Sequence, residues 1–272
     1  MSLRTGANAA LRRGGAMALI TAEYIEIVYP VPVKYLLIIL FLYSSALIAK
    51  EFKCGMAEGY APFQYVVKGK GAGIDMEIVK VFNKIGPHKI IVSTGHWDDL
   101  VAELFHTKRI DCLIGMEKSS RREDIFTFSN VVYQRESSII LREDSSISKL
   151  TSLKGKLVCG DKDSPVESYL LGLEKISMRV IYMETKEKCM VALRDGLVSA
   201  AILPDKVSNF LGPKLGFKTK EILDRDFFSD VGFAFKKSDD IDLTNFNAQL
   251  LKLHHSKSFI NLLKKKNIKV SR

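Results

Sequence analysis

Between residues 52 and 115 the chain alternates apolar runs of strand length with segments of helical periodicity. The apolar runs are Phe52–Ala57, Lys89–Ser93 and Asp111–Gly115, which have the composition of buried strands. Helices are predicted between them, over Asp75–Ile85, where apolar residues recur at helical spacing, and over Asp98–His106, which begins with acidic residues. This order of elements is typical of a parallel sheet with crossover helices. The sequence therefore predicts an α/β fold.

The same alternation begins again after residue 155. Strands are predicted at Lys156–Gly160, Met178–Met183 and Ala200–Leu203. Two helices are predicted between them, one from Ser164 to about residue 173 and one over Thr185–Arg194. No residue-level similarity relates this unit to the first, so it indicates a second α/β unit and not a sequence repeat. A strand and two helices are predicted near the C-terminus, at Gly232–Phe235, Thr244–His254 and Ser256–Lys265.

The segment after the third strand has the features of a site for a small anion. Ser120 and Glu123 have the S-x-x-E spacing of a helix capping box. The first turn of a helix leaves backbone N–H groups free and carries a partial positive charge, and Arg122 lies in that turn. A guanidinium group can bind a carboxylate with two parallel hydrogen bonds, so a carboxylate is the anion expected here. The alternative is that Arg122 is a surface arginine on a short helix.

An uncharged apolar run, Tyr35–Ala49, precedes the first strand. It is shorter than the roughly 20 residues that a membrane span needs. A lysine before it and small residues at its end are typical of a secretory signal. Residues 1–50 are therefore predicted to be a leader, with translation starting near Val33 and cleavage after Ala46 or Ala49. An uncleaved N-terminal anchor is the alternative.

The net charge of +10 does not by itself predict a nucleic-acid partner. Lysines and arginines are scattered singly, Lys264–Lys266 is the one basic run, and aromatic residues do not alternate with basic ones. A solvated cationic surface is the expected consequence.

The cysteines and histidines predict no metal site, and no cofactor is expected. Cys54, Cys112, Cys159 and Cys189 lack metal-ligand spacing, and the five histidines form no ligand cluster. Export would permit disulfides. Three of the four cysteines lie in strand-like runs, however, so each of those three is predicted to be a small buried apolar residue.

Several short segments follow one another in a specific order. They are GMAEGYAPFQ (Gly55–Gln64), GIDMEIVKV (Gly73–Val81), Trp97–Leu104 followed by Arg109–Gly115, Arg122 with Phe128-Ser129, LKGKLV (Leu153–Val158), Ala192–Ile202 and Gly232–Lys237. In order and spacing they resemble the extracytoplasmic solute-binding receptors of polar amino-acid ABC transporters. The resemblance covers roughly residues 52–260, and it rests on the shared order because each motif alone consists of common residues.

The resemblance implies a two-lobed periplasmic-binding-protein fold, with two parallel-rich sheets joined by a hinge of two strands. The chain would cross between the lobes near Val132–Glu136 and return near Phe228–Gly232. Residues 51–133 and 232–272 would then form lobe one, and residues 134–231 lobe two. A solute would be enclosed in the cleft between the lobes.

Carried over residue by residue, the resemblance implies a ligand site at the ends of the lobe-one strands. Tyr60 and Trp97 match aromatic positions that stack on flat or cationic groups. Arg122 matches the arginine that binds the ligand carboxylate, and Ser119 lies in the same loop. Gly115 matches a position whose backbone meets the ligand amine. For Trp97, core packing at a helix start is the alternative.

Three positions depart from the family pattern. Glu117 stands where a small hydroxyl residue is usual, and it could pair with Arg122, hold a cationic group of the ligand or point to solvent. The lobe-two loop that usually offers hydrogen-bond donors reads DKDSP over residues 161–165, where Ser164 is followed by a proline without an N–H. The aspartate that usually holds the amine comes one residue late, as Asp205, which could instead cap a helix.

The expected function is that of a monomeric extracytoplasmic receptor, without catalytic residues, that passes an amino acid or related zwitterion to an ABC permease. Two alternatives remain open. One is a cyclohexadienyl dehydratase-like enzyme on the same fold, with Glu117 as its acid–base group. The other is a non-transport sensor or adhesin with an altered pocket. If Glu117 faces the cleft, its charge predicts a preference for ligands with a net positive charge.

Overall fold

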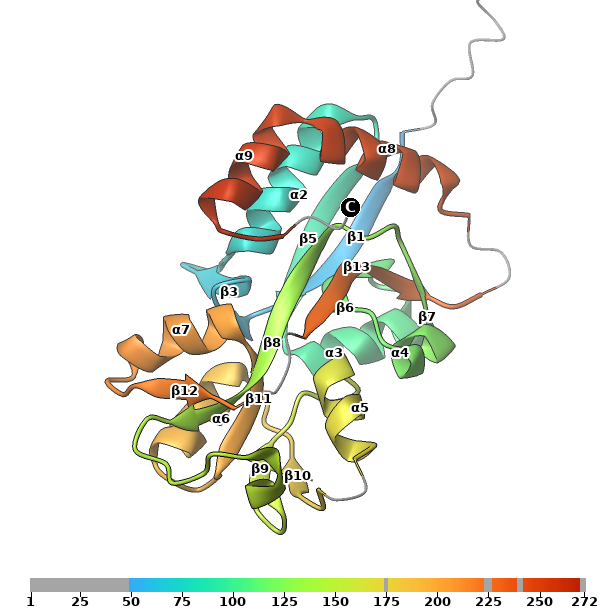
Figure 1. Ribbon diagram of the computed structural model, residues 1–272. Coiled ribbons are helices and arrows are strands. Elements are labelled where there is room, and N and C mark those ends of the chain that lie inside the picture. The colour runs from blue at the N-terminus through green and yellow to red at the C-terminus, as the bar shows by residue number, and fades with distance from the viewer. Residues whose placement is uncertain (1–48, 174–175, 223–226, 239–241, 270–272) are drawn as a thin grey trace, which may run out of the picture. The chain divides into compact units, whose positions relative to one another are not determined.

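The computed structural model describes residues 49–173, 176–222, 227–238 and 242–269. Figure 1 shows the arrangement of the helices and strands in this part of the chain. The strands are β1 (Glu51–Ala57), β2 (Gly59–Tyr60), β3 (Gln64–Val67), β4 (Lys70–Ala72), β5 (Lys89–Gly95), β6 (Cys112–Glu117), β7 (Phe126–Phe128), β8 (Tyr133–Arg142), β9 (Leu157–Cys159), β10 (Arg179–Ile181), β11 (Ala200–Pro204), β12 (Thr219–Glu221) and β13 (Phe228–Lys236). The helices are α2 (Ile74–Ile85), α3 (Trp97–Ala102) continued by a π-helical turn (Glu103–Thr107), α4 (Ser120–Ile125), a 3₁₀ turn (Leu150–Leu153), α5 (Pro165–Leu171), α6 (Lys186–Arg194), α7 (Asp205–Lys214), α8 (Thr244–His255) and α9 (Lys257–Lys265).

The largest sheet has the strand order β10-β9-β11-β8-β13-β6-β1-β5. β1 pairs in parallel with β5 and β6, and β9 pairs in parallel with β10 and β11, as the alternation of strands and helices predicts. β8 and β13 run antiparallel to their neighbours and join the two parallel groups. Below, the β1 side means β1, β5, β6 and the segments that follow them, and the β9 side means β9, β10, β11 and the segments that follow them.

The expectation of two separate sheets is wrong, because the hydrogen-bonded path runs through both groups. The first residues of β8, Tyr133–Glu136, pair with β13, and its following residues, 137–140, pair with β11. No glycine or proline interrupts this ten-residue strand, so one strand serves both sides. The predicted crossing segments lie in this paired region of β8 and β13.

Apolar side chains cover the sheet on the β1 side through α2, α8 and α9. Ile78, Val79 and Phe82 form the buried stripe of α2, which repeats at helical spacing. The rings of Phe82 and Phe246 lie 5.1 Å apart, so α2 and α8 share one core beneath the sheet. Figure 1 shows α9 beside α2, which completes this layer.

A small antiparallel sheet, β2-β3-β4, follows β1 and was not predicted from the sequence. Its strands are only 2 to 4 residues long, too short for a period-two pattern to be recognised. It places Tyr60 and Gln64 beside the end of β1, where the side-chain carbonyl of Gln64 accepts a hydrogen bond from the Ala57 N–H at 2.8 Å.

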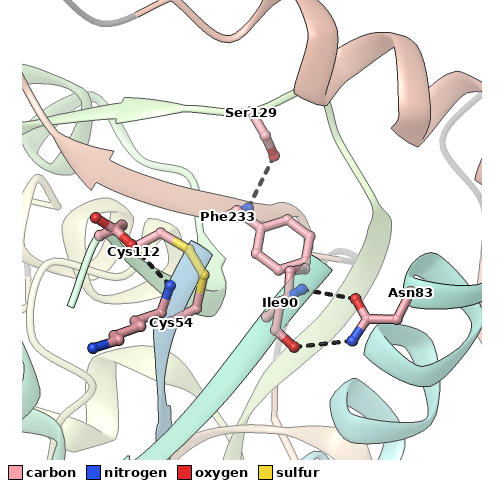
Figure 2. The surroundings of a disulfide bond; sticks show 8 residues. Cys54, Asn83, Ile90, Cys112, Ser129 and Phe233 are labelled. Carbon is pink, nitrogen blue, oxygen red and sulfur yellow. Dashed lines mark hydrogen bonds between the residues drawn. A yellow bond between two sulfur atoms is a disulfide. The ribbon is translucent and has the colours of Figure 1, made fainter. Parts of the chain in front are cut away.

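The prediction that Cys54, Cys112 and Cys159 are buried is confirmed, and the disulfides that export would permit are present. Cys54 bonds to Cys112 and Cys159 bonds to Cys189. Figure 2 shows the first bridge, which ties β1 to β6. The partners are 58 and 30 residues apart in the chain, so only the folded arrangement reveals the pairing. Disulfides are typical of proteins outside the cytoplasm.

Removal of the second bridge in the variant Cys159→Ala/Cys189→Ala is expected to lower the free energy of unfolding by about 2–4 kcal/mol, because the unfolded chain regains loop entropy. Urea unfolding followed by circular dichroism would measure the change. Dithiothreitol should destabilise the wild type and should have no effect on a variant that lacks all four cysteines. An unchanged urea midpoint for the double variant would contradict the pairing.

The predicted secretory signal lies outside the described residues, apart from Ala49 at its end. Among the helices that are described, none is long and apolar enough to cross a membrane.

Candidate functional site

A cavity of about 360 Å³ is lined by residues from both the β1 side and the β9 side. Most of its wall follows the carboxyl ends of parallel strands, where ligands bind in α/β sheets. The lining includes, from the β1 side, Glu58, Tyr60, His96, Trp97, Asp98, Gly115, Glu117 and Arg122 and, from the β9 side, Asp161, Lys162, Asp163, Tyr182, Glu184 and Lys186. Tyr60, Trp97, Gly115, Glu117 and Arg122 were predicted from the sequence, and the structure brings them to one place.

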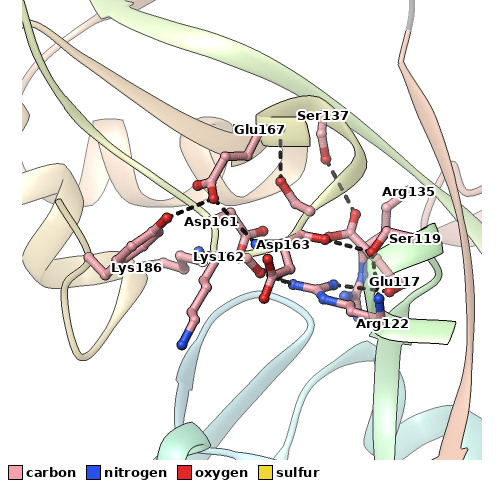
Figure 3. Close-up of polar contacts among 12 residues, drawn as sticks. Glu117, Ser119, Arg122, Arg135, Ser137, Asp161, Lys162, Asp163, Glu167 and Lys186 are labelled. Atoms are coloured by element: carbon pink, nitrogen blue, oxygen red, sulfur yellow. Dashed lines mark hydrogen bonds and ion pairs between the residues drawn. The ribbon is translucent and has the colours of Figure 1, made fainter. Parts of the chain in front are cut away.

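Arg122 connects the two sides of the cavity (Figure 3). Its guanidinium group donates one hydrogen bond to the backbone oxygen of Glu117 at 3.0 Å and another to the backbone oxygen of Lys162 at 2.7 Å. Its side chain is only 12% exposed. The alternative of a freely solvated surface arginine is therefore excluded.

Ser119 caps α4, whereas the capping box was predicted at Ser120. The Ser119 hydroxyl accepts a hydrogen bond from the Arg122 N–H at 3.3 Å. The same hydroxyl donates to the backbone oxygen of Asp163 at 2.6 Å. Ser119 thus fixes the start of α4 and also contacts the β9 side, although it is not among the residues that line the cavity.

Glu117 ends β6 as a buried carboxylate that faces the cavity. It is 3% exposed, and its hydrogen bond from the Ser137 hydroxyl is long, at 3.4 Å. Burial and the neighbouring carboxylate of Asp161 raise the pKa of Glu117, although the surrounding cations oppose the shift. The alternative that Glu117 points to solvent is therefore excluded.

Asp161 lies two residues after the end of β9 and is a buried acidic group of the cavity on the β9 side. Its carboxylate lies 2.8 Å from the Lys186 ammonium group and 3.9 Å from the Arg122 guanidinium group. Burial acts to raise the pKa of Asp161, but the charges of Lys186 and Arg122 outweigh it and hold the pKa below its usual value. Sequence reasoning noted Asp161 only as part of an altered loop, although its position after a buried strand was a usable indication.

A buried charge pair that was not predicted from the sequence links the cavity wall, through Arg135, to Asp75 behind it. The Arg135 guanidinium group lies 2.9 Å from the Asp75 carboxylate, and both side chains are 2% exposed. Tyr133 donates to Asp75 at 2.5 Å, and Gln64 donates to it at 2.6 Å. Gly115 has φ +68°, and a Cβ there would overlap Asp75 and Gln64, so glycine is required at this position.

Aromatic side chains supply the apolar part of the wall. The Arg135 guanidinium carbon lies 5.0 Å from the Tyr60 ring centroid, and the Lys186 ammonium group lies 5.8 Å from it. Burial and the charge of Glu117 raise the pKa of Tyr60 well above its usual value. Trp97 lines the cavity while it also packs on the core cluster of Leu100, so both roles considered for it are compatible.

Besides Ser119, the predicted site residues Ser164 and Asp205 are not among the lining residues. Ser164 caps α5 by accepting a hydrogen bond from the Glu167 N–H at 3.2 Å, as its capping-box spacing predicts. Asp205 is the first residue of α7, and its side chain makes no capping bond there. Burial raises the pKa of Asp205 to about 6, with Glu221 adding to the effect and a hydrogen bond from Ser138 opposing it.

A histidine bridges two acids at the edge of the cavity. His96 Nε2 lies 3.3 Å from Glu58, and His96 Nδ1 lies 3.2 Å from Glu184 on the β9 side. Among the described residues, no group of three or more His, Cys, Asp or Glu side chains is placed to hold a metal ion.

The model of the bacterial extracellular solute-binding proteins, family 3, matches residues 52–266. The arginine-binding extracellular protein ArtP of Bacillus subtilis (strain 168) is 31% identical over 110 residues, which are 40% of this chain and 43% of that protein. The match therefore spans less than half the length of ArtP. The ABC transporter arginine-binding protein 1 of Escherichia coli (strain K12) is 20% identical over 207 residues, covering 74% of this chain and 84% of that protein.

Two solved structures show the likeness in fold. The arginine-, lysine-, histidine-binding protein ArtJ from Geobacillus stearothermophilus superposes with a TM-score of 0.69 at 23% identity, over 79% of this chain and 94% of that one. A histidine kinase sensor domain with similarity to periplasmic binding proteins gives a TM-score of 0.71 at 19% identity, over 82% of this chain and 98% of that one.

Proposed function

Because the chain belongs to the bacterial extracellular solute-binding proteins, family 3, we propose that it is an extracytoplasmic receptor that binds an amino-acid-like solute in the cavity of Arg122 and Glu117 and delivers it to an ABC permease. The mixed α/β fold is that of periplasmic binding proteins. Proteins with similar sequences are named as binding proteins and not as enzymes.

The observation that carries this proposal is the pairing of opposite charges across one enclosed space. Arg122 supplies a fixed cation, while Glu117 and Asp161 supply carboxylates, and all three line the cavity. A zwitterion presents the complementary pattern, a carboxylate beside an ammonium group. The cavity volume of about 360 Å³ lies within the range of small-ligand sites.

A solute with an additional positive charge fits the cavity best. Six carboxylate side chains line it against four lysine and arginine side chains, and one of those four, Arg135, is already paired with Asp75 below the cavity. A cation beside Glu117 would stabilise the charged form of a carboxylate that burial disfavours. The two similar proteins that are named for arginine binding also support a preference for a positively charged solute.

Closure of two lobes around the solute is part of the proposal. Residues 51–133 with 232–272 would form lobe one, and residues 134–231 would form lobe two, with β8 and β13 as the connecting strands. The hydrogen bonds from Arg122 to Lys162 and from Ser119 to Asp163 cross this boundary, which supports a cleft with polar contacts at its rim. A hinge in the paired region of β8 and β13 would open and close it.

Secretion through the N-terminal leader is proposed on the same grounds. The apolar run over residues 35–49 would direct export, and the disulfides Cys54–Cys112 and Cys159–Cys189 fit a compartment where such bonds persist. For this role we expect the protein to be a monomer that binds to an ABC permease.

A dehydratase-like enzyme is the second candidate, and one observation favours it. A buried carboxylic acid with a raised pKa, such as Glu117, is suited to acid–base catalysis. Binding by opposite charges needs no further group, whereas the enzymatic role would need a second proton-transferring partner. Native mass spectrometry of the purified protein separates the two, because a co-purifying amino acid supports the receptor and a prephenate-like acid supports the enzyme.

Thermal-shift screening against all common amino acids should show stabilisation by basic ones in the wild type, because a bound ligand stabilises the folded state by mass action. The variant Glu117→Thr should shift the preference toward neutral amino acids, since it removes the Glu117 carboxylate, one of the negative charges that line the cavity. Glu123→Thr, an exposed acid on α4, is the matched control and should keep the wild-type profile. Identical profiles for Glu117→Thr and the wild type would remove Glu117 from the site, and no response in either would favour a non-transport role.

A further inference from the structure

The Lys186 side chain already occupies an ammonium-binding position inside the cavity. Its Nζ atom lies 2.8 Å from the Asp161 carboxylate and 5.8 Å from the Tyr60 ring centroid. The two side chains of the ion pair are 17% and 16% exposed. Figure 3 shows the pair among the polar groups that surround Arg122.

These surroundings are the ones that a ligand ammonium group requires. A carboxylate accepts charge-assisted hydrogen bonds, and the face of an aromatic ring attracts a cation. Asp161 from the β9 side and Tyr60 from the β1 side offer both to one position in the cavity. The ammonium of Lys186 therefore stands where the ammonium of a solute would be held.

The position of Lys186 in its helix supports this assignment. Lys186 is the first residue of α6, whose N-terminus carries a partial positive charge that disfavours a cation. The ion pair with Asp161 offsets this unfavourable placement. Lys186 has a flexible four-carbon stem, so its ammonium group can leave the cavity without movement of the helix.

Resting on the function proposed above, we propose that Lys186 is a specificity-determining residue whose ammonium group competes with that of the solute for the Asp161 carboxylate. A group attached to the same chain acts at an effective concentration on the order of millimolar or higher. A solute must displace the Lys186 ammonium group from Asp161, so ligands with a single weak ammonium contact are rejected. Ligands that also contact Arg122 or Glu117 are accepted, because these additional contacts supply enough binding free energy to displace the Lys186 ammonium group.

The lowered pKa of Asp161 agrees with this competition, since Lys186 and Arg122 both favour the carboxylate form against the effect of burial. Without Lys186, the nearest cation to the Asp161 carboxylate among the described residues would be the Arg122 guanidinium group, at 3.9 Å. It would then be an under-compensated buried charge, and an incoming ammonium group would bind it more tightly.

The test compares the wild type with Lys186→Met, which keeps the apolar stem and removes the charge. Calorimetric titration with L-arginine should show an affinity about tenfold or more higher for Lys186→Met, because the tethered competitor is gone. Adding Asp161→Asn to this variant should abolish the gain. Lys214→Met is the matched control, because the Lys214 side chain is 56% exposed and pairs with Glu187 on α6, and neither residue lines the cavity.

An affinity of Lys186→Met equal to or below that of the wild type would overturn the proposal, and so would a gain that survives Asp161→Asn. Binding of L-arginine by Lys186→Met alone would support the competition while contradicting the proposed function of the wild type. If neither protein binds any common amino acid, both proposals are wrong. Lys186→Gln, which also removes the charge, should behave in the same direction and serves if Lys186→Met does not fold.

Discussion

Replacing Asp75 with asparagine is expected to lower the free energy of unfolding by about 3–5 kcal/mol, the range observed when one partner of a buried charge pair is removed. Asp75 and Arg135 are each 2% exposed and lie 2.9 Å apart, so the substitution leaves the Arg135 charge buried without its partner. Asparagine keeps only one acceptor oxygen, so Tyr133 and Gln64, which donate to different oxygens of Asp75, cannot both keep their acceptor. Urea unfolding at neutral pH would measure the loss.

Two further variants make this experiment specific. Glu77→Gln on the same helix removes a carboxylate that is 43% exposed and pairs with Lys266, so it should cost less than about 1 kcal/mol. The double variant Asp75→Asn/Arg135→Met should recover part of the loss, because it removes the uncompensated charge. A loss below 1 kcal/mol for Asp75→Asn would show that the pair does not support the cavity.

Replacing Arg122 with alanine is expected to weaken solute binding by about 2–5 kcal/mol, as for truncation of one partner in a buried hydrogen-bonded charge pair. Arg122 is 12% exposed, and it also holds the backbone of Lys162 on the β9 side. Its loss would remove both the expected carboxylate partner and one contact across the cavity. Calorimetric titration with the amino acid that gives the largest thermal shift would measure the effect.

Arg121→Ala is the matched control for Arg122. The Arg121 side chain is 63% exposed and pairs with Asp163 at the rim, so its removal should change the affinity by less than about 1 kcal/mol. Equal affinities for the wild type and Arg122→Ala would contradict the assignment of Arg122 to the solute carboxylate.

Local sequence patterns predicted most of the regular elements, because the interactions that fix them are between near neighbours. The apolar spacing of α2 and the cap of α5 at Ser164 appear in the structure nearly as predicted. The helix expected over 98–106 is divided into α3 and a π-helical turn, a distinction that apolar spacing does not carry. The long strand β8 was recognised only as a crossing segment, since its partners come from both sides of the sheet.

The proximity of Tyr60, Trp97, Glu117 and Arg122 could be predicted from the sequence, because each was expected close to the carboxyl end of a strand and parallel strands end at one edge. Their partners were decided only by the tertiary structure. Asp75 and Arg135 are separated by 60 residues, and the paired cysteines by 58 and 30.

The charge balance of the cavity also depended on the tertiary structure. Lys186 meets Asp161 only because β9 and β10 pair in parallel and end at the same edge. A residue's type and its neighbours in the chain predict where a charge can lie. Whether that charge is free or neutralised depends on a group that the fold brings within a few ångströms, and an ion pair is therefore a property of the fold.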